Sequence, residues 1–211
     1  MNHKKKYYEN AAKTIIKNLE KRRMKGYYCA DRESAVKKLL ELIPNGASIG
    51  WGGSVTLSET GIMDAIRNGD YNIIDREQAK TPEEYKKVSA QICGCDYFLM
   101  STNAITLDGE LVNVDGRGNR VSFLCYGPEN VVVVAGMNKV VADVDAGIKR
   151  TRNIAAPPNT VRLDRNTPCA VTGECADCLS PDCICAQTVI TRLSIIPNRI
   201  NVILVGEELG F

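Results

Sequence analysis

Histidine is almost absent from this chain of 211 residues, which contains only His3. His3 lies among the first residues of the chain, a position unsuited to a catalytic base, so mechanisms built on Ser-His-Asp or Cys-His are excluded. Acid–base chemistry must then fall to carboxylates and lysines. Fixed-period repeats and low-complexity linkers are also absent, which favours a single domain over residues 26–211, preceded by an N-terminal helix within residues 1–25.

The chain also lacks a strong net charge and a long apolar run. Its 27 basic and 25 acidic residues give a formal charge of +2, which argues against a nucleic-acid partner although basic residues gather at positions 4–6 and 21–25. No apolar stretch approaches the ~20 residues that span a bilayer, and none follows the first lysines as in a signal peptide. We therefore expect a cytoplasmic protein that binds neither nucleic acid nor membrane.

Cysteine, in contrast, is abundant, with nine in total and five within residues 169–185, CAVTGECADCLSPDCIC. A cytosolic location and an odd count argue against a disulfide framework. Cys29, Cys93, Cys95 and Cys125 stand in apolar surroundings, where a free cysteine behaves as a small buried hydrophobe. The cluster near the end of the chain therefore needs a separate explanation.

Short apolar strands alternate with amphipathic helices along the chain. Helices are predicted at residues 8–24, 32–43, 56–68, 81–93 and 141–156, the last ending before Pro157. Strands are predicted at residues 26–30, 47–51, 71–75, 96–102, 131–136, 187–196 and 199–211, with a hairpin at 105–118 that turns at Asp108 and Gly109. The alternation predicts an α/β fold with an open, mainly parallel sheet flanked by helices, and the cysteine-rich segment is an elaboration of it.

The first polar cluster is a glycine loop at residues 49–61, IGWGGSVTLSETG. It joins a predicted strand to a predicted helix, where free backbone amides and the hydroxyls of Ser54 and Thr56 suit an anion. Gly52 and Gly53 allow a ligand to approach the backbone closely. The loop has neither the Gly-Lys-Ser/Thr of a P-loop nor the third glycine of a Rossmann GxGxxG. A tight turn that only caps a helix is the alternative interpretation.

Two further clusters, NVDGRGNR at residues 113–120 and GMNKVV at residues 136–141, also lie at predicted strand ends. Ligands of open parallel sheets bind at the carboxyl ends of the strands, so polar residues at these positions are candidates for a site. Acid–base roles are predicted for Glu59, Asp115 and Lys139, and Glu59 is also placed to cap its helix. The residues predicted to orient an anionic substrate are Asn119, Arg120 and Asn138.

These clusters carry a resemblance to a known family. GWGGSVTLSETG, NAITLDGELVNVDGRGNRVSFLCYGP and VVAGMNKVVADVDAGIKRTRNIAAPPN resemble the lactate-utilisation (LUD, formerly DUF162) domain family, over about residues 34–211. The resemblance implies the NagB/RpiA/CoA-transferase-like α/β fold, whose members bind phosphorylated sugars, CoA esters or folates at glycine-rich strand ends. The GGSVT loop is similar to the phosphate-binding loop of ribose-phosphate isomerases in that superfamily.

The same resemblance implies an activity and partners. Members of the family are linked to the oxidation of lactate to pyruvate with an iron–sulfur partner subunit, so the chain resembles an oxidoreductase subunit that acts on a 2-hydroxy acid. Proteins of this superfamily often form dimers, which implies a homodimer. The alternative is a non-catalytic ligand-binding or regulatory protein in which zinc holds the C-terminal segment.

The cysteines of residues 169–185 have the spacing C-x5-C-x2-C-x4-C-x-C. A C-x2-C pair can place two thiolates on one metal, and four thiolates complete either a tetrahedral zinc site or a [4Fe–4S] cluster. One compact run without histidine favours the [4Fe–4S] cluster, with zinc and metal-free thiols as alternatives. The block resembles PC-x5-C-x2-C-x6-C of related sequences. The ligands implied by that resemblance are Cys169, Cys175, Cys178 and Cys185. Cys183 departs from the pattern and competes for the fourth position.

Overall fold

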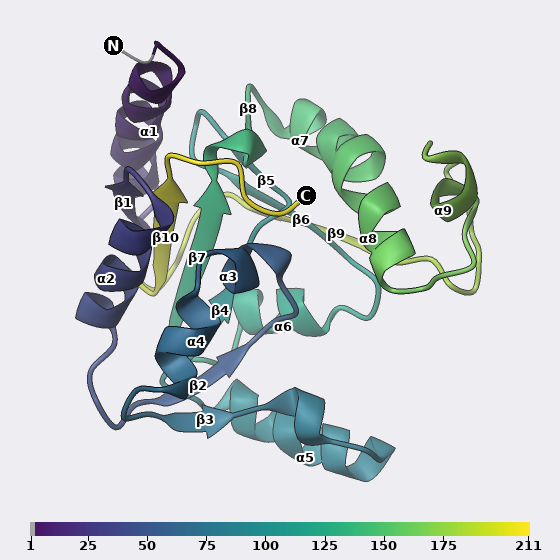
Figure 1. Ribbon diagram of the computed structural model, residues 1–211, viewed down its shortest axis with the longest axis horizontal. Coiled ribbons are helices and arrows are strands. Elements are labelled where there is room, and N and C mark those ends of the chain that lie inside the picture. Colours follow the sequence, from purple (N-terminus) through teal and green to yellow (C-terminus); the bar gives the residue numbers. More distant parts are fainter. Residues whose placement is uncertain (1–2) are drawn as a thin grey trace.

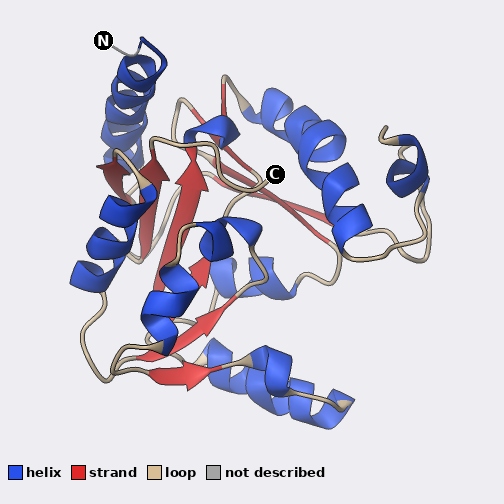
Figure 2. Ribbon diagram, in the orientation of Figure 1, coloured by secondary structure: helices blue, strands red, loops and turns tan. Residues whose placement is uncertain are grey.

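The computed structural model describes residues 3–211 and contains two β-sheets surrounded by helices (Figures 1 and 2). The main sheet has six strands in the order β1-β10-β7-β4-β2-β3, and each neighbouring pair is parallel. Its strands are β1 (Lys25–Cys29), β2 (Ser48–Trp51), β3 (Asn72–Ile74), β4 (Tyr97–Met100), β7 (Asn130–Gly136) and β10 (Ile200–Val205). The predicted open, mainly parallel α/β fold is confirmed.

Six helices cover the two faces of this sheet. They are α1 (His3–Lys21), α2 (Arg32–Leu42), α3 (Val55–Glu59), α4 (Ile62–Arg67), α5 (Pro82–Cys93) and α6 (Asn119–Cys125). On β7, Val131 and Val133 pack among side chains of α1, α5 and α6, whereas Val132 and Val134 pack among those of α2, α3 and α4. A parallel strand buried on both faces needs helices on both sides, as its uninterrupted apolar run predicts.

Two of the predicted helix starts are confirmed by their caps. The Asp31 side chain accepts a hydrogen bond from the Ser34 backbone N–H at 2.8 Å, and the Thr81 hydroxyl accepts one from the Glu84 N–H at 3.2 Å. Both form capping boxes, and Pro82 occupies the first turn of α5, where its missing N–H costs nothing.

The second sheet has four strands in the order β8-β5-β6-β9. They are β5 (Ala104–Thr106), β6 (Leu111–Asp115), β8 (Val140–Val141) and β9 (Gln187–Thr191). β5 and β6 form the predicted antiparallel hairpin, and Gly109 in its turn has a φ of +85°, which glycine adopts without steric cost. β9 pairs with β6 whereas β10 joins the main sheet, so the two strands predicted within residues 187–211 lie in different sheets.

The helix predicted at residues 141–156 does not end before Pro157, so that boundary was wrong. It continues as α7 (Val144–Arg150), a π-helical turn η3 (Thr151–Ala155) and α8 (Ala156–Arg162). Pro157 and Pro158 fall in the first turn of α8, and the N–H of Ala156 donates to the carbonyl of Thr151. Proline has no N–H to donate to the preceding turn, and the wider π-helical turn accommodates this loss without ending the helix.

The helix predicted at residues 56–68 is also different, because it is split into α3 and α4 at Gly61. Gly61 has a φ of +78°, in the left-handed region, which cannot continue a right-handed helix. At the start of the chain, residues 1 and 2 of the predicted N-terminal segment lie outside the described residues. Within residues 3–211, none of the helices has the length and apolar character needed to cross a membrane.

Candidate functional site

Four strands end at one cavity of about 460 Å³. The loops after β2 and β4, the end of β6 and the short helix η2 (Met137–Lys139) after β7 line one side, and η3 and α8 line the other. The polar residues that the strand ends contribute are Ser54, Thr56, Ser101, Thr102, Asn103, Asp115 and Lys139. Ligands of parallel α/β sheets bind at this edge, so this cavity is the candidate functional site.

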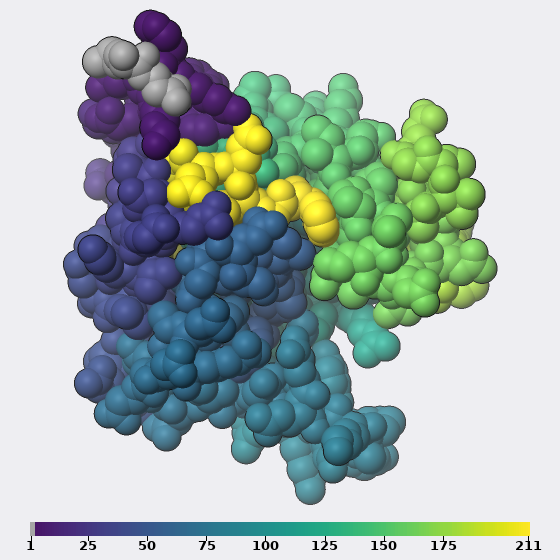
Figure 3. Space-filling model, in the orientation of Figure 1, coloured from purple at the N-terminus to yellow at the C-terminus, as the bar shows by residue number. Residues whose placement is uncertain are grey.

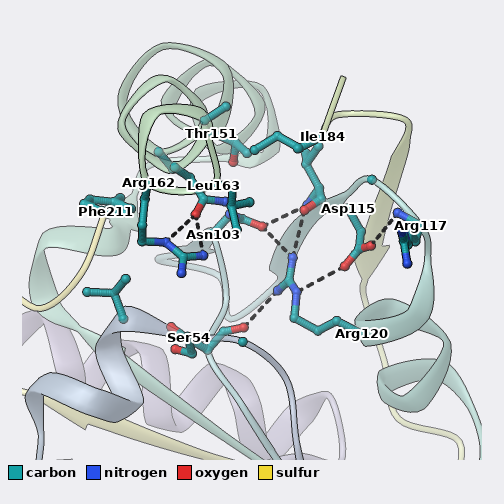
Figure 4. Close-up of a pocket in the computed structure, with 18 of the residues that line it drawn as sticks. Ser54, Asn103, Asp115, Arg117, Arg120, Thr151, Arg162, Leu163, Ile184 and Phe211 are labelled. Carbon is teal, nitrogen blue, oxygen red and sulfur yellow. Dashed lines mark hydrogen bonds and ion pairs between the residues drawn. The ribbon is translucent and has the colours of Figure 1, made fainter. Parts of the chain in front are cut away.

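The lining of the cavity carries six cationic and two acidic residues. These are Arg76, Arg117, Arg120, Lys139, Arg162 and Arg165, with Glu77 and Asp115 as the acids. Arg117, Arg162 and Arg165 are exposed at the rim, whereas Arg120 is half-buried and Lys139 is buried. Figure 4 shows Arg162 entering from α8 and Arg120 from the opposite side. This excess of positive charge in a concave site attracts anions.

The glycine loop brings two arginines close to the backbone. A Cβ atom on Gly53 would lie 2.8 Å from Arg76 Nη2, and one on Gly52 would lie 3.2 Å from the Arg120 side-chain carbons. Ser54 caps α3, since its Oγ accepts a hydrogen bond from the backbone N–H three residues further on, at 3.3 Å. Gly52 is therefore covered by Arg120, whereas Gly53 and Ser54 face the cavity.

Arg120 joins the ends of strands from both sheets. Its guanidinium donates hydrogen bonds of 2.6–3.3 Å to the carbonyls of Ser101 and Val114 and to the side chains of Asn103, Asn113 and Asp115. Burial lowers the pKa of Arg120, and the nearby Asp115 carboxylate opposes this shift. Because the five bonds use the donors of the guanidinium, Arg120 shapes the cavity and leaves ligand contacts to the other arginines.

Asp115 organises the loop that follows β6. One carboxylate oxygen accepts hydrogen bonds from the backbone N–H groups of Arg117 and Gly118, at 3.1 and 2.7 Å, and the other lies 3.3 Å from Arg120 Nε. Asn119, one residue further on, donates to the hydroxyl of Tyr85 at 2.9 Å. Residues 115–119, DGRGN, thus form one wall of the cavity, and these hydrogen bonds fix its conformation.

Lys139 lies at the bottom of the cavity with two hydroxyl groups. Its side chain is only 4% exposed, and its Nζ donates to Ser101 Oγ at 3.3 Å. Ser101 Oγ in turn donates to Thr56 Oγ1 at 3.3 Å. The three residues follow β7, β4 and β2, which are neighbours in the main sheet, so the parallel topology places them together.

The environment of Lys139 favours its neutral form. Burial, together with the positive charges of Arg150 and Arg120, lowers the pKa of Lys139 from 10.5 to about 7, while the negative charge of Glu59 acts in the opposite direction. Both forms of the amine are then populated at neutral pH, as an acid–base group or a nucleophile requires.

Glu59 and Asn138 contact the end of the described chain. Glu59 Oε2 accepts from the Gly210 N–H at 2.7 Å, and Asn138 Oδ1 accepts from the Leu209 N–H at 3.1 Å. The Asn138 amide also donates to the carbonyls of both residues, at 3.4 and 3.3 Å. These bonds bring Phe211 to the cavity, and Figure 3 shows this segment, in yellow, crossing the face of the molecule toward the green helical region.

The cavity thus gathers most of the residues predicted from the three polar clusters. Those that line it are Gly53, Ser54, Thr56, Asp115, Asn119, Arg120 and Lys139. Gly52, Glu59 and Asn138 are not among the residues that line it, and the roles of all ten stay predictions. Ser101 was not among the residues predicted from the sequence, although its place near the end of the predicted strand 96–102 is a usable signal. The arginines on α8 and beyond were not predicted either, because the helix was predicted to end before them.

The cysteine segment forms part of the same cavity. Ile184 and Cys185 line it, and a Cβ atom on Gly116 would lie 3.1 Å from Ile184 Cα, so the DGRGN wall packs closely on the segment. The Asp182 carboxylate accepts from the Asn166 N–H at 3.0 Å, which ties the segment to the chain just after α8.

The thiols of this segment lie near one another without forming a preformed metal site. Burial raises the pKa of Cys185 to about 12, and the neighbouring Cys183, Cys169 and Cys175 act in the same direction. Among residues 3–211, no group of three or more His, Cys, Asp or Glu side chains is arranged to hold a metal ion. Thiolates are suitable ligands for zinc and for iron–sulfur clusters, so the chemistry of these side chains fits either metal group. Their positions in the structure do not form a complete coordination shell.

The other four cysteines differ from one another in burial. Cys29 and Cys95 are buried and Cys93 is half-buried, as their apolar sequence surroundings predict. Cys125, at the end of α6, is exposed, so the expectation of a buried thiol was wrong there. Cys125 is the last residue of α6 and precedes Tyr126, which is also exposed.

The parallel sheet, with a glycine loop and a polar cavity at its carboxyl edge, places the chain among the open α/β proteins. The chain belongs to the LUD domain family, whose sequence model matches residues 12–205. The comparison with curated proteins finds no match. The family resemblance expected from the three sequence clusters is therefore confirmed.

Two solved structures illustrate the likeness of the fold. A DUF162 family protein from Deinococcus radiodurans matches with a TM-score of 0.52 and 13% identity, over 94% of this chain and 98% of that one. Ribose 5-phosphate isomerase A from Neisseria gonorrhoeae matches 54% of each chain with 16% identity and a TM-score of 0.36. The first likeness supports the fold alone, and the second is too distant to carry an argument.

The pKa of Lys139 predicts a pH-dependent cost of folding. The unfolded chain binds more protons than the folded one between pH 7 and 10.5, so this cost is fully present below about pH 7 and is relieved as the pH rises toward 10.5. Lys139→Met should therefore raise the free energy of unfolding by about 1–3 kcal/mol near pH 6 and by much less near pH 10, measured by urea unfolding.

Lys149, an exposed lysine on α7, provides the matched control. Lys149→Met should change the free energy of unfolding by less than ~0.5 kcal/mol at both pH values. An equal effect of Lys139→Met at the two pH values would contradict the shifted pKa.

Proposed function

We propose that the protein binds a small anionic metabolite in the cavity at the carboxyl edge of the main sheet. The observation that carries this proposal is the excess of cationic over acidic residues in the lining, six against two. Arg76, Arg117 and Arg162 supply guanidinium groups, whose planar donors suit a carboxylate or a phosphate. The volume of about 460 Å³ is adequate for a small metabolite.

Within this proposal the polar residues have separate tasks. Lys139 exchanges a proton with the ligand, because its amine is half-titrated near neutral pH. Asp115 holds the DGRGN wall and the Arg120 guanidinium in place. Glu59 and Asn138 act indirectly, since they hold the segment that brings Phe211 to the cavity.

We further propose that the ligand belongs to 2-hydroxy-acid metabolism or a related pathway. The family name suggests lactate utilisation, and a 2-hydroxy acid carries the carboxylate that the arginines would bind. A cytoplasmic location, an iron–sulfur partner subunit and a homodimer are parts of the same proposal.

The cysteine segment supports a metal-binding role beside this cavity. We propose that Cys169, Cys175, Cys178 and Cys185 hold a [4Fe–4S] cluster, with Cys183 as the competing fourth ligand and zinc as the alternative metal. A bound cluster would supply one-electron chemistry next to the ligand, whereas zinc would only stabilise the segment. The non-catalytic, regulatory alternative corresponds to the zinc form.

Anion binding tests the first proposal directly. Inorganic phosphate, L-lactate and the uncharged lactamide are titrated into the protein by calorimetry. The two anions should bind and lactamide should not, and Arg76→Gln should weaken the binding by roughly 10- to 100-fold, since a hydrogen bond to a charged group contributes ~1.5–3 kcal/mol.

Arg192→Gln is the control, because it removes the same charge from an exposed side chain that is not part of the cavity lining. Equal weakening by both substitutions would show that only the net charge matters. If neither phosphate nor L-lactate binds, the proposal of an anion site in the cavity is wrong.

Metal analysis of protein purified without air tests the cysteine segment. We expect about four iron and four sulfide per chain, and Cys175→Ser should lose most of both, while Cys125→Ser, an exposed thiol outside the segment, keeps them. Comparing Cys183→Ser with Cys185→Ser identifies the fourth ligand. Stoichiometric zinc would favour the regulatory alternative, and a metal-free protein would overturn both.

A further inference from the structure

Lys139 is a buried amine whose hydrogen-bond partner is a hydroxyl group. In the described part of the chain, its Nζ donates to Ser101 Oγ at 3.3 Å, whereas the ion pairs that involve lining residues are formed by Arg120 with Asp115 and by Arg165 with Asp182. Burying a charged lysine without a carboxylate in contact is costly, so such a lysine is found where a neutral amine is useful. A neutral amine can act as a nucleophile as well as exchange a proton.

We propose that Lys139 is a covalent nucleophile, whose amine forms an imine with the carbonyl carbon of a small 2-oxo acid bound in the cavity. This inference rests on the proposed function of the cavity as an anion site and names the substrate class more closely. It makes Lys139 the residue that contacts the reacting carbon, with Ser101 and Thr56 as proton-carrying groups.

The charges around Lys139 favour its neutral, nucleophilic amine, and they also favour a substrate with a negative charge. A lysine becomes nucleophilic at neutral pH when it is desolvated or lies next to other cations, and both conditions hold here, with Arg150 and Arg120 as the cations and Glu59 as the opposing acid. The N–H donors of these two cations bond to protein oxygens, so the cations act on a ligand at Lys139 through their positive charge and without a direct hydrogen bond. A carboxylate bonded directly to the carbonyl carbon therefore fits this position, as in a 2-oxo acid.

The hydroxyl groups beside the amine supply the proton transfers that imine formation requires. The nitrogen lone pair attacks the carbonyl carbon, a C–N bond forms, and the nitrogen loses a proton while the carbonyl oxygen gains one. The nitrogen lone pair then forms the C=N bond as the C–O bond breaks, the second proton of the amine passes to the departing oxygen, and one water molecule leaves. Ser101 Oγ, bonded to Lys139 Nζ and to Thr56 Oγ1 at 3.3 Å each, is placed to carry these protons. The step needs no oxidant or reductant.

Reductive trapping tests this inference on the full-length protein. Pyruvate or glyoxylate is added with sodium cyanoborohydride, and the adducts are located by peptide mass spectrometry. Lys139 should be modified stoichiometrically and before the exposed lysines. Its rate should be half-maximal near pH 7 and level off about one pH unit higher, whereas exposed lysines continue to gain reactivity toward about pH 10. Ser101→Ala should slow the adduct at Lys139 at least about tenfold without abolishing it.

Lys139→Met and Lys149→Arg are the paired controls. The first should remove the early adduct and the second, on an exposed lysine, should leave it unchanged. Modification of exposed lysines without Lys139, or a Lys139 rate that follows theirs at every pH, overturns the inference. Calorimetry with inorganic phosphate on the same samples separates the two proposals: phosphate binding without an adduct overturns only the imine, and loss of both overturns the anion site as well.

Discussion

The hydrogen bonds of Arg120 hold the two sheets in the arrangement on which the cavity depends. One guanidinium bonds to Ser101 after β4 of the main sheet and to Asn113, Val114 and Asp115 of β6 in the second sheet. A planar group with five donors can satisfy several buried acceptors at once, which lysine cannot do. The Arg120 guanidinium therefore fixes the positions of the two sheets, and the cavity lies between them.

This arrangement explains why the positive charge of the cavity is divided into two sets. The donors of Arg120 are used by protein acceptors, so its role is structural, whereas Arg117 and Arg162 are exposed at the rim and Lys139 is buried against the Ser101 hydroxyl. Positive charges that are not balanced by protein carboxylates reduce stability, and such a cost is typical of a binding site. The buried amine of Lys139 is the clearest instance, because its surroundings disfavour its own charge.

The parallel sheet and the polar residues at the strand ends of the cavity were largely predictable because they follow from local patterns. The buried run of β7 and the capped start of α5 each depend on residues close in sequence. The continuation of the helix through Pro157 was not predictable, since a π-helical turn leaves no residue signature. That one turn carries α8 and its Arg162 to the cavity, and this is why the cationic rim was missed.

Other differences arose from contacts between distant residues. Glu59 and Asn138 have the residue types of a ligand site, yet they bond to residues 209–210, more than 70 positions away. Likewise, the spacing of the cysteines predicted thiolate ligands but gave no indication that Ile184 and Cys185 border the cavity. Sequence patterns identify such groups, whereas their partners depend on the tertiary fold.

The position of a bound anion tests the central claim most directly. A crystal structure of the protein grown with phosphate would locate it. The account predicts density inside the cavity, within hydrogen-bond distance of Arg76, Arg117 or Arg162 and close to Gly53. Phosphate bound only at surface lysines, with the cavity filled by water, would contradict it.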